Sequence, residues 1–165
     1  MNTPLLRLIR IALLAAAAAT PLLAAAATPR EFTEDSFAQI RARYAGRPLV
    51  VHIWGMTCGP CLVELPKWGA LQRRRPDMNL VLIQADQAPA RASEQTLQGA
   101  GLGRAESWGL TQPLDDYLRA SIDPKWAGDM PRTLLLAPGG QLTVIRGVAD
   151  IGAVARWLDG VAARK

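Results

Sequence analysis

The sequence predicts an α/β domain in which helices flank a central mixed β-sheet. Two apolar runs rich in β-branched residues, 49–54 and 79–85, are each followed by a segment with helical composition, and this alternation favours parallel strands. Two later apolar runs are separated by a turn at Gly139-Gly140, which predicts a hairpin and therefore antiparallel strands in the same sheet. Residues 28–165 are enough for one domain with a single core.

The first helix is expected over 33–44. A threonine at its start can cap the helix, two acidic residues follow the threonine, and three apolar side chains share one face. Gly46 ends this helix, and the run 49–54 that follows is typical of a buried strand. A second helix is expected over 58–75, with a kink at Pro66.

The remaining elements are predicted by shorter signals. The segment 104–125 has no clear periodicity and contains at most a short helix at 113–120. The other expected elements are a strand at 79–85, a helix at 90–100, hairpin strands at 133–137 and 142–146, and a final amphipathic helix at 151–161. Helices therefore separate the early strands, and a tight turn joins the late ones.

The first 27 residues have the pattern of a secretory signal peptide. Two arginines precede an apolar stretch at 11–19, and alanines at 24–27 offer small-residue cleavage sites. The alternative is an uncleaved membrane anchor, although the apolar stretch 11–27 is short for a membrane span. In both cases the domain 28–165 is expected in the periplasm, where disulfides persist. The leader supplies two of the chain's five net positive charges, so nucleic acid is not an expected partner.

The only two cysteines form the sequence Cys58-Gly59-Pro60-Cys61. Two cysteines are too few for a disulfide framework or for a four-cysteine zinc site. Their place after a predicted strand and at a predicted helix start is typical of a redox dithiol, because a helix N-terminus stabilises a thiolate on Cys58. Cys61 lies one turn deeper. An inert structural disulfide and half of a soft-metal site are the alternatives, and we expect no metal and no other cofactor.

The segment 54–61, Trp-Gly-Met-Thr-Cys-Gly-Pro-Cys, resembles the active-site motif of thioredoxins, W-x-x-x-C-G-P-C. Glu64 and Pro66 continue it in a way that resembles the TlpA/ResA branch of secreted thioredoxin-like proteins, and 129–133 resembles the G-x-P-x-T segment of that branch. The resemblance covers about 30–163. It implies the thioredoxin fold and thiol–disulfide oxidoreductase activity.

The same resemblance implies a cis peptide bond before Pro131, which leaves the backbone of Met130 to pair with an extended substrate segment. Four positions depart from the family pattern. Thr57 stands where many thioredoxins have a second tryptophan, and His52 replaces a buried acid. Leu62 stands where the TlpA branch commonly has a basic residue, and Asp129 stands where glycine is usual. The change at Thr57 removes a large apolar surface beside the first cysteine.

Three further side chains near the motif have two interpretations each. Glu64 shares the helix face of Cys61, so it could take the Cys61 proton, or it could be a solvent-facing acid. His52 could relay a proton, or it could be a core histidine with satisfied ring nitrogens. Trp54 could pack beneath the motif and could also contact the substrate.

The sequence therefore predicts a periplasmic thiol–disulfide oxidoreductase, and most simply a disulfide reductase. The Gly-Pro dipeptide between the cysteines is similar to that of the strongly reducing thioredoxins. The resemblance implies disulfide-bonded exported proteins as substrates, in cytochrome c maturation or oxidase copper-site assembly, and a membrane thiol-relay protein as electron donor. The alternatives are a disulfide oxidase or isomerase, and a copper-binding assembly module that uses Cys58, Cys61 and Met56 or Met130. We expect a monomer.

Overall fold

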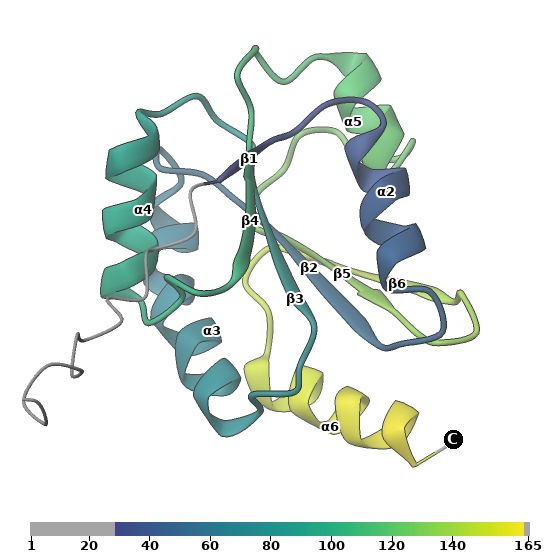
Figure 1. Cartoon of the computed structure of the whole chain (residues 1–165). Coiled ribbons are helices and arrows are strands. Elements are labelled where there is room, and N and C mark those ends of the chain that lie inside the picture. Colours follow the sequence, from purple (N-terminus) through teal and green to yellow (C-terminus); the bar gives the residue numbers. More distant parts are fainter. Residues whose placement is uncertain (1–28, 164–165) are drawn as a thin grey trace, which may run out of the picture.

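The computed structural model of this chain describes residues 29–163. These residues form a mixed sheet with helices on both faces, as the sequence predicts, and the sheet has six strands (Figure 1). The leader expected at 1–27 lies outside the described residues. Within the described residues, no helix is long and apolar enough to cross a membrane.

The strand order in the sheet is β1-β4-β3-β2-β5-β6. The first four strands in that order pair in parallel, whereas β5 pairs antiparallel with both β2 and β6. The strands are β1 (Arg30–Glu31), β2 (Leu49–Trp54), β3 (Leu80–Gln84), β4 (Glu106–Gly109), β5 (Arg132–Leu136) and β6 (Leu142–Arg146). The helices are α2 (Ser36–Arg43), α3 (Gly59–Arg74), α4 (Ala90–Gly99), α5 (Asp116–Ile122) and α6 (Ile151–Ala162).

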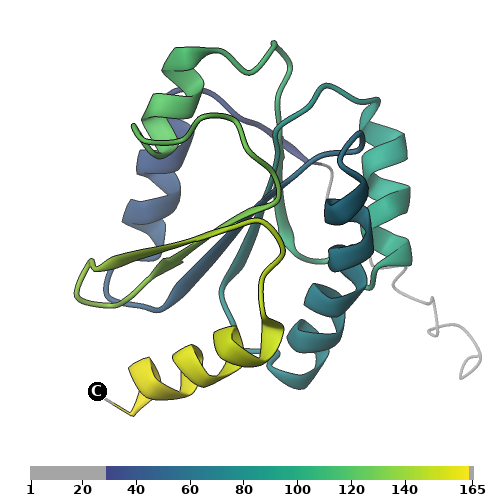
Figure 2. The same cartoon turned by 180° about the vertical axis from the view of Figure 1, so that it is seen from behind.

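The sheet divides the hydrophobic core into two layers, and the side chains of β2 alternate between them. Val50 and Trp54 pack in the layer that α3, α4 and α6 cover. Val51 and Ile53 point the other way, into the layer that α2 and α5 cover. Figures 1 and 2 show these two sets of helices on opposite sides of the sheet. Every residue of β2 is buried, which explains why this run lacks polar alternation.

The structure corrects the sequence predictions at several element boundaries. β1 and β4 are not predicted, and the short helix expected at 113–120 begins later, as α5. α2 begins at Ser36 with Asp35 at its N-cap, three residues after the expected start at Thr33. Pro66 lies inside α3, and the helix continues beyond it to Arg74.

The strand directions bring three loops to one edge of the sheet. Trp54 and Gln84 pair at the ends of the parallel strands β2 and β3, so the segments that follow these strands are neighbours. β5 runs antiparallel to β2, and Arg132 at its start pairs with Ile53. Pro131, directly before Arg132, therefore lies at the same edge as the segment that contains Cys58.

Candidate redox site

Cys58 and Cys61 form a disulfide at the N-terminus of α3, with 5.2 Å between their Cα atoms. Cys58 is the N-cap residue of this helix, and its Sγ accepts a hydrogen bond from the backbone N–H of Cys61 at 3.2 Å. Pro60 stands in the first turn, where its missing N–H leaves no helical hydrogen bond unmade. When the disulfide is reduced, the helix N-terminus and this N–H favour negative charge on Cys58.

The two sulfurs differ in their access to solvent. Cys58 is half-buried, whereas Cys61 is fully buried in the core beneath α3. Leu62 and Val63, which directly follow Cys61 on α3, are exposed apolar side chains, the latter 69% exposed, and Val148 in the loop before α6 is exposed as well. Cys58 is thus the sulfur that an incoming disulfide can reach, while Cys61 has no exposed surface.

Glu64 is fully buried, so the solvent-facing interpretation of this residue is wrong. Its Oε1 accepts hydrogen bonds from the Trp68 indole N–H at 3.0 Å and from the backbone N–H of Ala149 at 2.9 Å. Its Oε2 is buried with no hydrogen-bond partner among the described residues. Burial raises the pKa of Glu64, although the two N–H groups and the Lys67 charge act in the opposite direction. This carboxylate one turn after Cys61 is thus able to accept a proton.

His52 lies in the interior of the sheet, in contact with the ring of Trp68 at 5.0 Å between centroids. Its Nδ1 lies 3.0 Å from the Thr133 hydroxyl, and its Nε2 has no partner in the described part of the chain. Burial lowers the pKa of His52 to about 3, so the ring is neutral near pH 7. The satisfied-histidine interpretation thus holds for one of the two nitrogens. The relay role stays a prediction.

Trp54 is fully buried within the same core layer as Cys61 and Leu65. This position supports packing beneath the motif as the role of Trp54. The expected contact of Trp54 with substrate stays a prediction.

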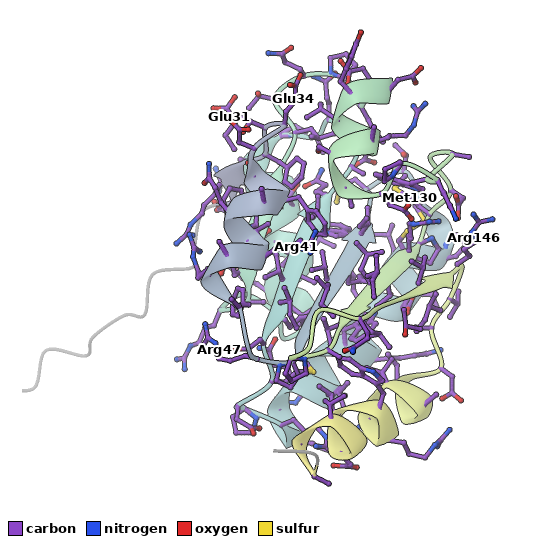
Figure 3. The ribbon with its side chains drawn as sticks, turned by 90° about the vertical axis from the view of Figure 1, so that its right-hand side faces the viewer. Glu31, Glu34, Arg41, Arg47, Met130 and Arg146 are labelled. Atoms are coloured by element: carbon purple, nitrogen blue, oxygen red, sulfur yellow. A yellow bond between two sulfur atoms is a disulfide. The ribbon has the colours of Figure 1, made fainter. Side chains whose placement is uncertain are left out.

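The peptide bond between Met130 and Pro131 is cis, as the resemblance implies. Met130 is half-buried, and the hydrogen bonds found among residues 29–163 include none to its backbone. Figure 3 shows Met130 on the same side of the domain as Arg146, whose strand pairs with Arg132. The indole N–H of Trp126 donates to the Asp129 carbonyl oxygen at 2.9 Å and so holds the loop that leads to Pro131.

Sequence reasoning missed two charged residues at this edge. Arg132 is 1% exposed and forms ion pairs with Asp123 and Asp129. Asp86 follows β3 and binds Thr57, the residue directly before Cys58. The sequence does offer one indication for Asp86. It directly follows the strand expected at 79–85, and a parallel pairing of that strand with the strand at 49–54 places Asp86 near the motif. No local pattern distinguishes Arg132 from an exposed arginine.

Soft-metal chemistry depends on the residues around the cysteines. Within residues 29–163, no group of three or more His, Cys, Asp or Glu side chains is placed to hold a metal ion. Met56 and Met130 both pack, half-buried, against the core layer that contains Cys61.

The fold is also that of known proteins. No family model and no curated protein sequence matches this chain. Among solved structures, a secreted Mycobacterium tuberculosis disulfide oxidoreductase homologous to E. coli DsbE shares 19% identity at a TM-score of 0.57, over 74% of this chain and 85% of that chain. A DsbF homologue from Corynebacterium diphtheriae shares 16% sequence identity at a TM-score of 0.61, over 73% of this chain and 75% of that chain.

A thioredoxin-related protein from Neisseria meningitidis serogroup B shares 18% identity at a TM-score of 0.57, over 70% of this chain and 85% of that chain. Identities this low establish architecture and not activity. Residues 29–163 of this chain have the thioredoxin fold, with a C-x-x-C disulfide at the start of α3.

Proposed function

We propose that this protein is a periplasmic thiol–disulfide oxidoreductase of the TlpA/ResA type that works as a reductase of exported proteins. The proposal rests mainly on the disulfide at the N-terminus of α3, in which Cys58 is half-buried and Cys61 is fully buried. The solved relatives, described as secreted disulfide oxidoreductases or thioredoxin-related proteins, support the same activity.

Reduction of a substrate proceeds in two exchange steps. The Cys58 thiolate attacks one sulfur of the substrate disulfide, forms a mixed disulfide and releases the first substrate thiolate. Cys61 then loses its proton to Glu64, and its thiolate attacks the Cys58 sulfur. The second substrate thiolate leaves, and the Cys58–Cys61 disulfide forms. The substrate gains two electrons and the enzyme loses two, so an external dithiol must reduce the enzyme again.

The surface around Cys58 is suited to an extended apolar polypeptide. Leu62, Val63 and Val148 supply exposed apolar area, and Met130 offers a backbone whose groups are not engaged elsewhere among residues 29–163. A substrate strand that pairs with Met130 would bring its disulfide to the Cys58 sulfur. Cytochrome c maturation and oxidase copper-site assembly are tasks of this kind, and a membrane thiol-relay protein is the proposed electron donor.

The reduction potential of the Cys58–Cys61 pair tests the direction of transfer. The protein is equilibrated with glutathione buffers, and insulin reduction is measured in parallel. We expect a potential near that of thioredoxin, about −270 mV, together with insulin reduction. A potential near that of the oxidant DsbA, about −120 mV, would contradict the reductase proposal and favour the oxidase alternative.

Substrates can be identified with a trapping variant. Cys61→Ser should accumulate mixed disulfides on Cys58 in periplasmic extracts, because the second exchange step is blocked. Cys58→Ser is the matched control and should trap none, since Cys61 is fully buried. If instead the reduced protein bound Cu(I) at stoichiometric amounts, and the double variant Cys58→Ser/Cys61→Ser lost this binding, the copper-binding alternative would replace this proposal.

A further inference from the structure

Asp86 lies where two parallel strands end side by side. It follows β3, two residues after Gln84, and Gln84 pairs with Trp54 at the end of β2. The backbone N–H of Ala85 donates to the Trp54 carbonyl oxygen at 2.8 Å, so the ladder continues to the point where the motif loop begins. The Asp86 side chain therefore meets the segment Gly55–Cys58 from the neighbouring strand.

The carboxylate of Asp86 holds the residue that precedes the first cysteine. Its Oδ2 accepts hydrogen bonds from the backbone N–H of Thr57 at 2.7 Å and from the Thr57 hydroxyl at 2.9 Å. Its Oδ1 accepts one from the Gln84 amide at 3.0 Å. Burial alone would raise the pKa of Asp86, but these hydrogen bonds outweigh burial and lower it. The group is thus a charged, multiply bonded acceptor at neutral pH.

The glycine at position 55 leaves room for this arrangement. A Cβ atom placed on Gly55 would lie 2.8 Å from Asp86 Oδ2 and 2.9 Å from Asp86 Cγ, closer than van der Waals contact. The carboxylate therefore occupies the space that any other side chain at this position would fill. The glycine after Trp54 and the aspartate after β3 form one unit, although they are 31 positions apart in the sequence.

The importance of this contact depends on the redox state. In the oxidised protein the disulfide ties Cys58 covalently to α3. In the reduced protein that bond is gone, and hydrogen bonds alone hold Cys58 in place. On the helix side, its Sγ and its carbonyl oxygen accept from the backbone N–H groups of Cys61 and Leu62. On the loop side, its own N–H donates to the Gly55 carbonyl oxygen, and Thr57 is bound to Asp86. Loss of the Asp86 contact therefore costs the reduced state more than the oxidised state.

We propose that Asp86 is a positioning residue for the dithiol, which anchors Thr57 and thereby holds Cys58 in place once the disulfide is open. This inference rests on the proposed redox use of Cys58 and Cys61 but not on the direction of electron transfer. It predicts that weakening the contact lowers the equilibrium constant for reduction of the Cys58–Cys61 disulfide.

The test is equilibration with glutathione at pH 7, in which two glutathione molecules reduce the protein disulfide and form one glutathione disulfide. We expect Asp86→Ala to lower the equilibrium constant about tenfold, which corresponds to a potential about 30 mV more negative. Thr57→Val removes only the hydroxyl bond and keeps the carboxylate, so we expect a smaller decrease. Thr57→Ser, which keeps the hydroxyl, should recover what Thr57→Val loses. Asp77→Ala removes an exposed carboxylate before β3 and should match the wild type.

Several outcomes would overturn the proposal. A through-space effect of the negative charge on a Cys58 thiolate would act in the opposite direction, since its removal in Asp86→Ala would stabilise the thiolate and raise the constant. It would also leave the equilibrium constant of Thr57→Val at the wild-type value. A higher equilibrium constant in Asp86→Ala, or an unchanged constant in both variants, contradicts the anchoring role of Asp86. Thr57 is exposed, so Thr57→Val keeps the test valid if Asp86→Ala does not fold. A wild-type protein that does not exchange with glutathione would instead refute the proposed function.

Discussion

The guanidinium of Arg132, buried directly after the cis proline, forms an ion pair with the carboxylate of Asp123. A second carboxylate, that of Asp129, lies 3.2 Å away on the solvent side. Without Asp123, the buried guanidinium keeps only the partly exposed carboxylate of Asp129. Asp123→Ala should therefore lower the free energy of unfolding by about 3–5 kcal/mol. Urea denaturation at pH 7 measures this loss.

Asp129→Ala provides the comparison within the same cluster. The Asp129 side chain is 40% exposed, so solvent screens its attraction to Arg132 and we expect a loss of at most about 1 kcal/mol. Equal losses in the two variants would show that Asp123 is not the main partner. The Arg132 pairing also lowers the pKa of Asp123, together with hydrogen bonds that outweigh its burial. The contribution of Asp123 to the free energy of unfolding should therefore be complete above its ordinary pKa of 3.8. It should vanish as the pH falls through the lowered folded-state pKa.

Glu64→Gln should separate stability from activity. The folded-state pKa of Glu64 is raised above the ordinary 4.5, so the wild type should lose stability as the pH rises from 4.5 through the folded-state value. Glu64→Gln should remove this decline. The variant should also slow the exchange step that consumes the Cys61 proton by about 10²-fold.

Both quantities can be measured without interference from the cysteines. Unfolding is followed in the oxidised protein, in which Cys58 and Cys61 do not titrate. Exchange is followed by the decay of a trapped mixed disulfide. Glu34→Gln, which changes an exposed glutamate, is the control and should alter neither quantity. Unchanged exchange in Glu64→Gln would remove Glu64 from the mechanism.

The sequence predicts the central strands and the redox motif well because their signals are local. The runs at β2 and β3 are mostly apolar and buried at every position, since both faces of the sheet are covered. The C-x-x-C pair stands between one such strand and a helix start, and this context determines its geometry. These features needed no knowledge of distant residues.

The remaining features depend on contacts between distant parts of the chain. β1 consists of two exposed residues and exists through its pairing with β4. Glu64 is buried and accepts a hydrogen bond from the backbone N–H of Ala149, 85 positions later. Arg132 is polar by sequence, and its buried guanidinium pairs with Asp123 in the preceding segment and with Asp129. In each case tertiary pairing overrides the local preference.

His52 should make the protein less stable in mild acid. Its pKa is about 3 in the folded chain and 6.5 in the unfolded chain, so between these values only the unfolded chain binds the proton. Lowering the pH from 7 to 5 should therefore cost about 2 kcal/mol of unfolding free energy through this group. His52→Asn keeps a donor for Thr133 and should show a flatter pH dependence, measured by urea denaturation of the oxidised protein.

The same variant tests the relay prediction for His52. If the ring relays a proton during exchange, His52→Asn should slow disulfide exchange near neutral pH while the protein remains folded. Insulin reduction against pH gives the comparison with the wild type. An unchanged rate would leave His52 with a structural role only, in contact with Trp68 and Thr133.

Gly69 sets the distance between the helix that carries the cysteines and its neighbour. A Cβ atom on Gly69, in the middle of α3, would overlap the carbonyl oxygen of Ala100 at the end of α4. Backbone cannot rotate away as a side chain can, so Gly69→Ala should lower the free energy of unfolding by about 3 kcal/mol. Gly99→Ala, at the last position of α4 with no atom within 4 Å of the new methyl group, should instead stabilise the protein by about 0.5 kcal/mol. Thermal unfolding of both variants would distinguish close packing at Gly69 from a general intolerance of alanine, which would lower the stability of both.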